Sequence, residues 1–421
     1  MMEPRNIQNT RKLTMGFMEK LLDGVVVEWK ALWEVTTWDK KFNAVDNFKQ
    51  PKVIKYNYLL SKEIKPLITK GGTVKLLTTN LSDLYTTEEL AGDIISQGEV
   101  VAIPWGGNPV VQYYKGSFLT SDNRIATSND TNLLCNKYLY YFLLNNLDLI
   151  GSFYRGSGIK HPSMAAVLDM EIPIPPLAVQ AEIVRILDAF TALTAELTAE
   201  LTARKKQYNY YRDQLLNFED GEVEWKTLGE ITKIQRGASP RPIAKYITND
   251  INAVPWIKIG DTTSGSKYVN KTKQKITAEG AKKSRILKKG DFILSNSMSF
   301  GRPYILDLDG AIHDGWASIS DFGENLNSDY LYHYLSSNNV QNYWISKINS
   351  GSVSNLNADL IKALPTPIPP LAEQARIVVI LDKFDTLTNS ISEGLPREIE
   401  LRQKQYEYYR DLLLSFPKPV A

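Results

Sequence analysis

Cysteine and histidine are scarce in this chain of 421 residues, and their scarcity narrows the chemistry that the chain can support. Cys135 is the one cysteine, so the chain cannot form an internal disulfide or a thiolate metal cluster, and this fits a reducing compartment. The three histidines, His161, His313 and His333, are scattered along the sequence. We therefore expect no metal site.

Long apolar runs and a strong net charge are also missing. No run reaches the ~18 apolar residues of a membrane-spanning helix, and the N-terminal "MMEPRNIQNTRKL" lacks the apolar core of a signal peptide. We therefore expect a soluble, cytoplasmic protein. The net charge is only +2, so any electrostatic argument for a partner must rest on local clusters of charge.

A duplication dominates what is present. The stretch "IPIPPLAVQAEIVRILDAF" at residues 172–190 returns as "TPIPPLAEQARIVVILDKF" at residues 366–384, an offset of 194. Three further blocks recur in the same order: "DGVVVEWKALWEV" (23–35) as "DGEVEWKTLGEI" (220–231), "KYLYYFLL" (137–144) as "DYLYHYLS" (329–336), and "QYNYYRDQLLNF" (207–218) as "QYEYYRDLLLSF" (405–416). The stretches between these blocks hardly resemble each other. Two variable domains are therefore set in a duplicated frame.

Both variable domains show short β-branched runs bounded by turn residues, followed by helical patches. The runs are "TVKLLTTN" (73–80), "EVVAIPW" (99–105), "AVPWIKIG" (253–260) and "DFILSNS" (291–297). A weak echo joins "QGEVVAIPWGGNP" (97–109) to "KGDFILSNSMSFGRP" (289–303), because each has a Gly-acid turn, a short strand and a glycine-bearing loop. We predict that the two variable domains share one α+β fold.

The repeated proline hinge predicts the start of a long helix. Pro175 and Pro176 favour an extended approach, and residues 177–217 then continue without glycine or proline, enough for a helix of ~60 Å. Apolar and aromatic positions alternate in spacings of four and three, as in a coiled coil. This seam comprises Ile183, Leu187, Phe190, Thr194, Leu197, Leu201, Arg204, Tyr208, Tyr211, Leu215 and Phe218.

The partner that we predict for this helix is its own second copy, packed antiparallel. The alternative is that each helix packs on its own domain as ordinary core. The second copy contains four inserted residues, with Gly394 and Pro396 at the insertion, so we expect that helix to break near 393–397. The resulting division is an N-terminal frame segment 1–35, a first variable domain 36–172, a first spacer helix 173–218, a second variable domain 219–366, and a second spacer helix 367–421.

This order of motifs resembles the specificity subunit of a type I restriction-modification enzyme. The likeness is strongest to the class whose spacer helix carries Thr-Ala-Glu-Leu repeats, here "TALTAELTAEL" (191–201), and it covers essentially the whole chain. It implies a non-catalytic subunit with two target recognition domains, each reading one half of a bipartite DNA sequence. It also implies that the spacer helices set the gap between the halves and dock two modification (adenine methyltransferase) subunits, and through them the restriction subunits.

The residues themselves give no sign of catalysis. An amino-methyltransferase needs an Asn/Asp-Pro-Pro-aromatic loop, but the Pro-Pro pairs here both stand in "IPPL". The nearest approach to a phosphate-binding loop, "GDTTSGSK" (260–267), has serine where lysine belongs. We expect no cofactor in this chain, and the resemblance assigns S-adenosylmethionine, ATP and Mg to its partner subunits. Two alternatives stay open: a helical scaffold without a DNA role, and an enzyme in its own right.

The second variable domain carries a concentrated positive charge. Residues 232–289 hold fourteen Lys or Arg against three acids, which favours salt-sensitive binding to phosphates over a merely solvated face. Arg241 in "GASPRP" (237–242) and Arg302 in "NSMSFGRP" (296–303) could pair with guanine edges or contact the DNA backbone. The candidate DNA-binding residues are Arg236, Arg241, Lys258, Lys267, Lys271, Lys273, Lys282, Lys283 and Arg302.

The first variable domain is less polarised. Residues 36–100 hold nine Lys against eight acids, so its candidates are local loops in which glycine allows close approach and Asn could read adenine. The candidates are Lys40, Lys41, Thr78, Asn80, Trp105, Asn108, Tyr114, Lys115, Arg155 and Lys160. The alternative for Trp105 and Tyr114 is a place in the hydrophobic core.

The repeated frame is the surface that we predict for the modification subunits, because only the frame presents the same groups twice. The candidates are Tyr210, Arg212, Tyr408 and Arg410, which belong to residue types enriched at interfaces. The alternative is that they stabilise the helix pair, as the heptad suggests for Tyr208 and Tyr211.

Overall fold

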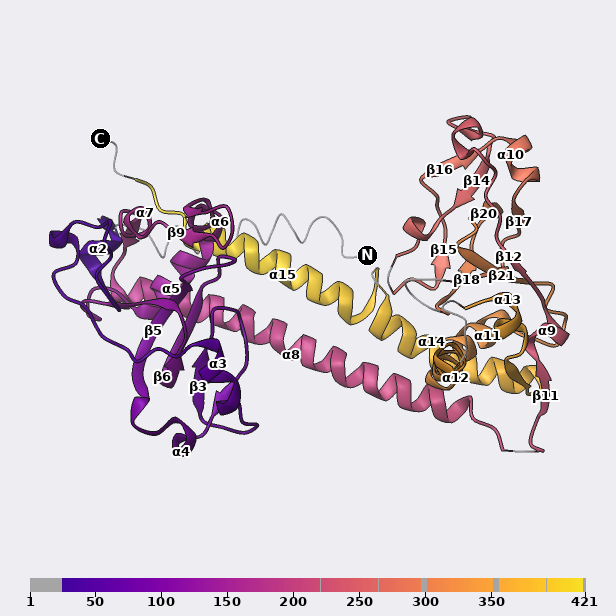
Figure 1. The fold of residues 1–421 in the computed structure, drawn as a ribbon, viewed down its shortest axis with the longest axis horizontal. Helices are drawn as coiled ribbons and strands as arrows, with labels where there is room; N and C mark the ends of the chain where they lie inside the picture. The colour runs from indigo at the N-terminus through magenta and orange to yellow at the C-terminus, as the bar shows by residue number, and fades with distance from the viewer. Residues whose placement is uncertain are drawn as a thin grey trace. The chain divides into compact units, whose positions relative to one another are not determined.

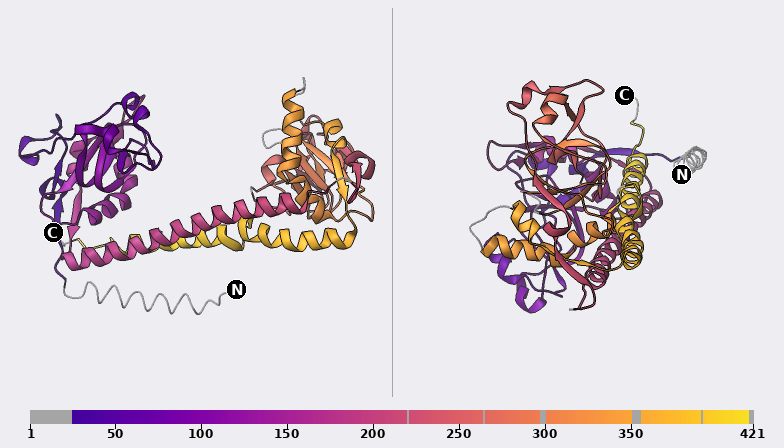
Figure 2. Two further views of the ribbon diagram at one scale, coloured as in Figure 1. Left: turned by 90° about the horizontal axis from the view of Figure 1, so that it is seen from below. Right: turned by 90° about the vertical axis from the view of Figure 1, so that its right-hand side faces the viewer.

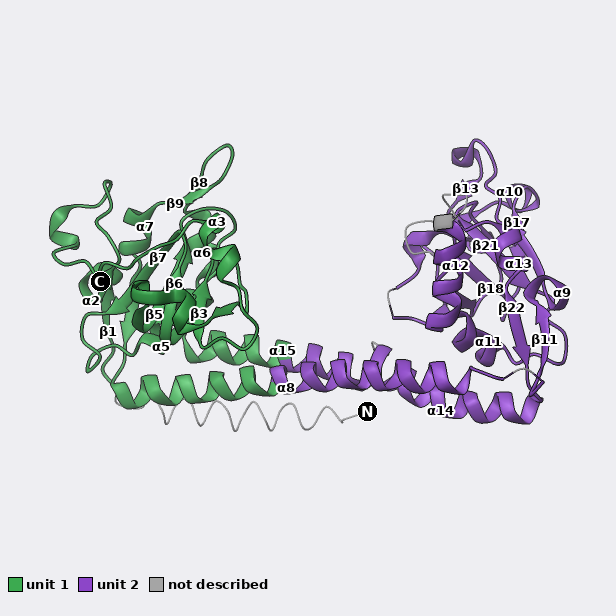
Figure 3. Ribbon diagram, turned by 60° about the horizontal axis from the view of Figure 1, so that its bottom comes forward, with its two compact units in different colours: residues 1–193, 403–421 green, residues 194–402 purple. Residues whose placement is uncertain are grey.

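The computed structural model describes residues 25–219, 221–263, 265–296, 301–350, 356–390 and 392–418 (Figure 1). The chain divides into two compact units, which are coloured separately in Figure 3. Unit 1 comprises residues 1–193 and 403–421, and unit 2 comprises residues 194–402. Each unit combines a mixed sheet with helices, as the α+β prediction requires.

Unit 1 is built on a six-stranded sheet in the order β2-β7-β5-β6-β3-β4. Its pairs are antiparallel except for β3 with β6. The strands are β2 (Thr36–Trp38), β3 (Val74–Leu77), β4 (Tyr85–Thr86), β5 (Ser96–Pro104), β6 (Gln112–Thr120) and β7 (Asn123–Ser128). The helices outside the frame are α3 (Ser61–Ile64), α4 (Glu88–Ala91), α5 (Asn136–Asn145), α6 (Leu147–Ser152) and α7 (Met164–Leu168).

Unit 2 repeats this sheet and adds another. The order β12-β21-β18-β19-β15 matches β2-β7-β5-β6-β3 strand for strand, including the single parallel pair, β15 with β19. These strands are β12 (Lys233–Arg236), β15 (Tyr268–Val269), β18 (Phe292–Ser295), β19 (Pro303–Leu306) and β21 (Trp316–Ser320). The prediction of one shared fold is therefore confirmed, and β5 and β18 are the two strands of the sequence echo.

The added sheet of unit 2 has the order β13-β16-β14-β20-β17. Its strands are β13 (Ile247–Thr248), β14 (Val254–Ile257), β16 (Gln274–Ile276), β17 (Arg285–Leu287) and β20 (Gly310–Ile312). The helices of this unit outside the frame are α10 (Ala278–Lys282), α11 (Ser328–Leu335), α12 (Asn338–Ser350) and α13 (Ala358–Lys362).

The repeated frame forms the same ribbon in each unit. In unit 1, β1 (Glu28–Ala31) pairs antiparallel with β10 (Glu171–Ile174), and in unit 2, β11 (Glu224–Thr227) pairs with β22 (Pro365–Ile368). The register is identical, with the "EW" of each copy opposite the "PI" of the hinge. Each ribbon is followed by a one-turn helix, α2 (Leu32–Val35) or α9 (Leu228–Ile231).

One glutamine in each hinge explains why "PIPPLAxQ" is written twice. Gln180 is fully buried, and its amide donates to the carbonyls of Leu133 and Pro175 at 2.8 Å and accepts from the Cys135 amide at 2.9 Å. Gln374 makes the same three bonds with the equivalent groups of unit 2. The two sites show that a buried amide with all its partners fixes the start of each long helix to its own domain.

Three long helices complete the frame: α8 (Leu177–Leu215), α14 (Leu371–Asn389) and α15 (Gly394–Leu413). In unit 1 the first part of α8 lies beside α15, with Phe190 stacked on Tyr409 at 5.3 Å between ring centroids (Figure 1, Figure 2). In unit 2 the last part of α8 lies beside α14, with Tyr208 stacked on Phe384 at 6.2 Å. The numbers of the partner residues fall as those of α8 rise, so the pairing is antiparallel as predicted.

The predicted seam coincides with the less exposed stripe of α8. Between residues 191 and 206, the partly buried residues are Thr194, Leu197, Leu201 and Arg204, and the others are exposed. Tyr211 departs from the prediction, since it is 42% exposed although it stacks on Phe384. Over the part of the chain that the structure describes, no helix combines the length and apolar character needed to cross a membrane.

The interruption in the second spacer lies slightly earlier than 393–397. Helix α14 ends at Asn389 and α15 begins at Gly394, whose φ is +75°. A side chain at Gly394 would meet the carbonyl oxygens of Thr386 and Leu387 at 2.4 and 2.7 Å. Pro396 stands in the first turn of α15, where its missing N–H costs little. The second helix therefore begins at the glycine, which lies against the last turn of the first helix, and the proline fits within its first turn.

Candidate nucleic-acid interface

The loops at one end of the shared sheet converge in both units. In unit 1 the loops that follow β2 and β5 are hydrogen-bonded to the beginning of β7. Asp39 N donates to Ile125 O, and Trp105 N donates to Asp122 O, both at 2.9 Å. In unit 2 the corresponding bonds run from Gly237 N to Trp316 O (2.8 Å) and from Asn296 N to Gly315 O (3.1 Å). Equivalent loops are thus tied together at the equivalent end of each sheet.

The first of these loops in unit 1 carries Lys40 and Lys41. Gln50, buried beneath it, accepts from the Phe42 amide at 2.8 Å and donates to the Lys40 carbonyl at 2.9 Å, which fixes the loop. A cavity of ≈ 430 Å³ opens between this loop and Trp105. Its lining residues are Lys40, Lys41, Phe42, Asn43, Ala44, Trp105, Arg124, Pro162, Ser163 and Met164.

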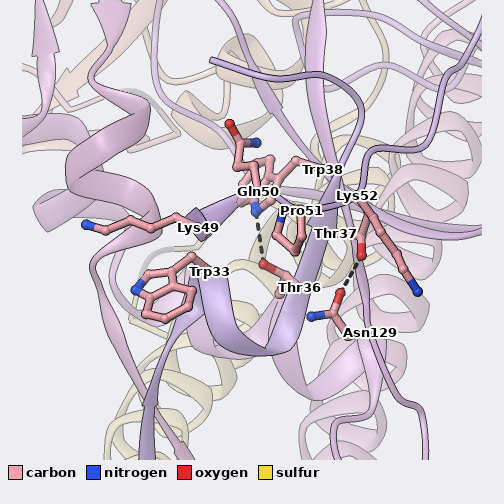
Figure 4. A pocket seen from close by; sticks show the side chains of 9 residues that line it. All are labelled: Trp33, Thr36, Thr37, Trp38, Lys49, Gln50, Pro51, Lys52 and Asn129. Atoms are coloured by element: carbon pink, nitrogen blue, oxygen red, sulfur yellow. Dashed lines mark hydrogen bonds between the residues drawn. The ribbon is translucent and has the colours of Figure 1, made fainter. Parts of the chain in front are cut away.

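A second cavity, of ≈ 260 Å³, borders the same loop on the side of α2 and β2 (Figure 4). Trp33 and Thr36 form one wall, and the side chains of Lys49 and Lys52 extend outward from it. Thr37 Oγ1 donates to Asn129 Oδ1 at its edge. Lys49 is engaged with Asp169 at 2.6 Å, so its charge is already partnered.

Arg124 was not among the residues that the sequence suggested for the site. It lies within a β-strand, and the pattern of a strand does not indicate which ring its side chain contacts. It is 4% exposed, lies 4.1 Å over the Trp105 ring, donates to Asn123 O at 2.8 Å and pairs with Asp122 at 3.3 Å. Burial lowers the pKa of Arg124, although Asp39 and Asp122 oppose this, and burial likewise raises the pKa of Asp39. The stacked pair fixes the side chain of Trp105 at the mouth of the larger cavity.

A short hairpin brings Arg155 and Lys160 to the same end of unit 1. It consists of β8 (Tyr154–Arg155) and β9 (His161–Pro162). His161 Nδ1 donates to Trp105 O at 2.7 Å, and Gly107 N, next to the exposed Asn108, donates to Lys160 O at 3.0 Å. The hairpin is therefore joined to the loop that follows β5.

The remaining candidates of unit 1 separate into two groups. Thr78 joins the convergent end, because its carbonyl accepts from Gln112 Nε2 at 2.7 Å and its hydroxyl donates to Asn80 O at 2.8 Å. Tyr114 instead packs edge-on against Phe118, and Lys115 pairs with Glu99 at 3.3 Å, both on the β5–β6 ribbon. The core alternative fits Tyr114.

The equivalent end of unit 2 gathers Arg236 and Arg241 around Asp314. Arg236 Nε donates to the Asp314 carbonyl at 3.3 Å, and Arg241 approaches the Asp314 carboxylate at 3.6 Å while 84% of its side chain stays exposed. Partial burial acts to raise the pKa of Asp314, but a hydrogen bond from Ser239 and interactions with His313 and Arg241 outweigh it and hold the pKa below its ordinary value. Arg302 lies over the Tyr304 ring at 5.4 Å. Residues 297–300 of its loop lie outside the described residues.

Some cations of the basic stretch of unit 2 are paired and others are not, and a charge count over residues 232–289 does not distinguish them. Several of its cations pair with acids that lie beyond residue 289: Lys233 with Asp321 (3.5 Å), Lys288 with Asp309 (2.8 Å) and Lys289 with Asp307 (2.7 Å). Lys283 bonds Tyr246 and Glu279, and Lys258 bonds Gln274. Lys271, Lys273 and Lys282 are exposed and make no ion pair with a described residue.

Lys267 lies in the interior instead of on a DNA-facing surface. It is 9% exposed, and its ammonium contacts Asp329 at 2.7 Å and Asp382 at 2.9 Å. Burial acts to lower the pKa of Lys267, but the two carboxylates outweigh it and raise the pKa. His333, which is fully buried, shares Asp382 at 2.8 Å. Lys267 therefore holds a frame helix to its domain, and we do not retain it in the interface.

The four candidates for partner contact also separate. Tyr210 is 62% exposed and its copy Tyr408 is 46% exposed, each edge-on to the next tyrosine at 5.4 Å. Arg212 is only 5% exposed, because it lies over the Tyr208 ring at 5.3 Å. Arg410 makes the matching contact with Tyr406 at 5.8 Å. The tyrosines carry the accessible part of this repeated surface, and the arginines pack against the helix pair.

Two units that repeat one sheet, with cations gathered at the same end of each, define a nucleic-acid-recognition protein with duplicated reading domains. The chain matches the family model "Type I restriction modification DNA specificity domain" over residues 39–204 and 221–401. It is 41% identical to the type I restriction enzyme EcoR124I/EcoR124II specificity subunit of Escherichia coli, over 96% of this chain and 98% of that one. It is 30% identical to the EcoprrI specificity subunit of Escherichia coli, over 90% and 92% of the two chains.

The solved structure of a type I S subunit from M. genitalium has the same fold, with a TM-score of 0.58 at 15% identity over 94% of this chain and 97% of that one. The chain therefore belongs to the family of type I restriction-modification specificity subunits. It is a non-catalytic subunit that carries DNA-recognition domains.

Proposed function

We propose that each unit reads one half of a bipartite DNA target through the convergent loops of its shared sheet. In unit 1 these loops present Lys40, Lys41 and Asn108, with Arg155 and Lys160 on the hairpin. In unit 2 they present Arg236 and Arg241, and the exposed Lys271, Lys273 and Lys282 add contacts to phosphates.

The observation that carries this proposal is the topological equivalence of the two sets of loops. The strands that support them match one for one, and the frame ribbons have the same register. A protein with one continuous target would not need the same loop-bearing end twice. Duplicated supports with divergent loops fit a target of two halves with different sequences.

We further propose that α8 and its antiparallel partners set the gap between the half-sites, and that the exposed tyrosines Tyr210 and Tyr408 contact two modification subunits. S-adenosylmethionine would then be bound by those subunits, and ATP and Mg by the restriction subunits. The complex would act in the cytoplasm. A helical scaffold without a DNA role would not explain why cations gather at the equivalent sheet end of both units.

The test is to express the chain with its modification subunits and to map modified adenines by sequencing genomic DNA. The expected result is one bipartite motif with a fixed gap. A further Thr-Ala-Glu-Leu unit inserted after Leu201 adds ~6 Å and ~40° of helix. It should lengthen the gap by about one or two base pairs, at ~3.4 Å per base pair, and leave both half-sites unchanged. A contiguous motif, or an unchanged gap, would contradict the proposal.

A further inference from the structure

The β8–β9 hairpin of unit 1 exposes an apolar side chain that the core does not use. Figure 3 shows the segment beside β8 leaving the body of the unit as a projecting loop. Ile159, in this loop, is 71% exposed. Single exposed apolar residues are common on protein surfaces, so exposure alone assigns no role. The support and the charges around Ile159 provide the argument.

Ile159 is held in place by the loop that follows β5. A side chain added at Gly106 would come within 2.9 Å of Ile159 Cγ2, so the isoleucine rests directly on this glycine. Below it, Tyr154 is buried and its hydroxyl donates to Pro104 O at 2.7 Å. With the His161 bond to Trp105, these contacts fix both strands of the hairpin. A side chain that is already fixed loses little further freedom on binding.

The surroundings of Ile159 favour DNA as its contact. Arg155 and Lys160 belong to the same hairpin and are exposed, and residues 154–162 contain no acid. The two cations suit phosphates, while the exposed apolar side chain suits an apolar group on a base. In the major groove that group is the C5 methyl of thymine.

The width of the hairpin decides between the grooves. Two paired strands lie ~4.8 Å apart before their side chains are counted. The major groove, ~12 Å wide, admits such a ribbon, whereas the minor groove is only ~6 Å wide. The hairpin can therefore present Ile159 to base edges only from the major groove.

We propose that Ile159 is a specificity-determining residue of unit 1 and selects a thymine by contact with its C5 methyl group. This inference rests on the proposed function, because it requires unit 1 to read one half-site. It adds a residue and a base preference that the charge pattern of the chain does not supply.

The experiment uses the full chain bound to its modification subunits, and the methylation motif of the wild type provides the duplex. Each thymine of the motif is replaced in turn by deoxyuridine, which lacks the methyl group, and binding is measured by competition. Wild type should lose about four-fold in affinity at one thymine of one half-site, as for one buried methyl. Ile159→Ala should be insensitive to deoxyuridine at that position and should keep the sensitivities of wild type elsewhere.

Two further variants sharpen the test. Gly106→Ala would press on Ile159 at 2.9 Å and on the His161 ring at 3.1 Å, so it should displace the hairpin loop without removing Ile159 and weaken the same deoxyuridine effect. Leu90→Ala, which removes a 50% exposed apolar side chain from α4 of the same unit, should behave as wild type. Equal deoxyuridine effects in wild type and Ile159→Ala, or a unit 1 half-site without an A·T pair, would overturn the inference and leave the bipartite function standing. Absence of a bipartite motif in wild type would instead overturn the proposed function.

Discussion

Three exposed lysines of unit 2, Lys271, Lys273 and Lys282, make no ion pair within the described part of the chain and should set the salt dependence of DNA binding. We expect Lys271→Gln, Lys273→Gln and Lys282→Gln together to flatten the plot of log affinity against log salt. Each phosphate contact contributes a slope of about 0.9, so three contacts contribute about 2.7. Between about 50 and 200 mM salt, wild type should therefore lose about 40-fold more affinity than the triple variant.

The matched control is a second triple variant, Lys233→Gln, Lys288→Gln and Lys289→Gln. It removes the same charge from the same unit, but its lysines are already paired with aspartates. Its slope should change less. Fluorescence anisotropy with labelled duplex DNA of random sequence, at several salt concentrations, measures both slopes. An unchanged slope in the first variant would place those lysines away from phosphates, and equal changes in both would refute the assignment by ion pairing.

Three further predictions concern the frame. Gln180→Ala or Gln374→Ala should lower the free energy of unfolding by about 3 kcal/mol, because buried backbone groups lose their partner; a thermal shift comparable to that of an exposed Gln→Ala change would contradict this. Asp382→Asn should destabilise by about 1–3 kcal/mol at neutral pH. Burial acts to raise the pKa of Asp382, but hydrogen bonds from His333 and Lys267 outweigh it and lower the pKa. The wild-type advantage should therefore be full above the ordinary value of 3.8 and be lost as pH falls through the lowered pKa. Tyr210→Ala with Tyr408→Ala should weaken binding of the modification subunits about ten-fold, measured by titration; unchanged affinity would exclude the tyrosines from that interface.

The architecture of the frame was predictable because it rests on local rules. Proline before a helix leaves a positional mark along the chain, and a seam spaced by fours and threes leaves a periodic one. Within α8 the seam prediction was correct for all but Tyr211, whose place in the interior is taken by Arg212, and Phe218 lies beyond the end of the helix at Leu215. A period identifies the face of a helix, but it does not show which long side chain folds back onto a neighbouring ring.

The availability of charged side chains for DNA binding was predictable only in part, because ion pairs join residues that are far apart in sequence. Counting residues 232–289 assigned Lys267 to DNA, whereas acids at positions 329 and 382 bury it. Arg124 was missed for the converse reason, since its stacking partner Trp105 comes from a separate loop. Pairwise contacts of this kind leave no pattern along the chain.

The sequence by itself determined that two variable domains of one fold are set in a duplicated helical frame, because repetition and helical period are properties of the chain. Only the tertiary structure decided which loops meet at one end of each sheet, which cations are neutralised, and that Ile159 rests on Gly106. These depend on strand order and on side-chain contacts across long separations in sequence. They therefore follow from packing in three dimensions.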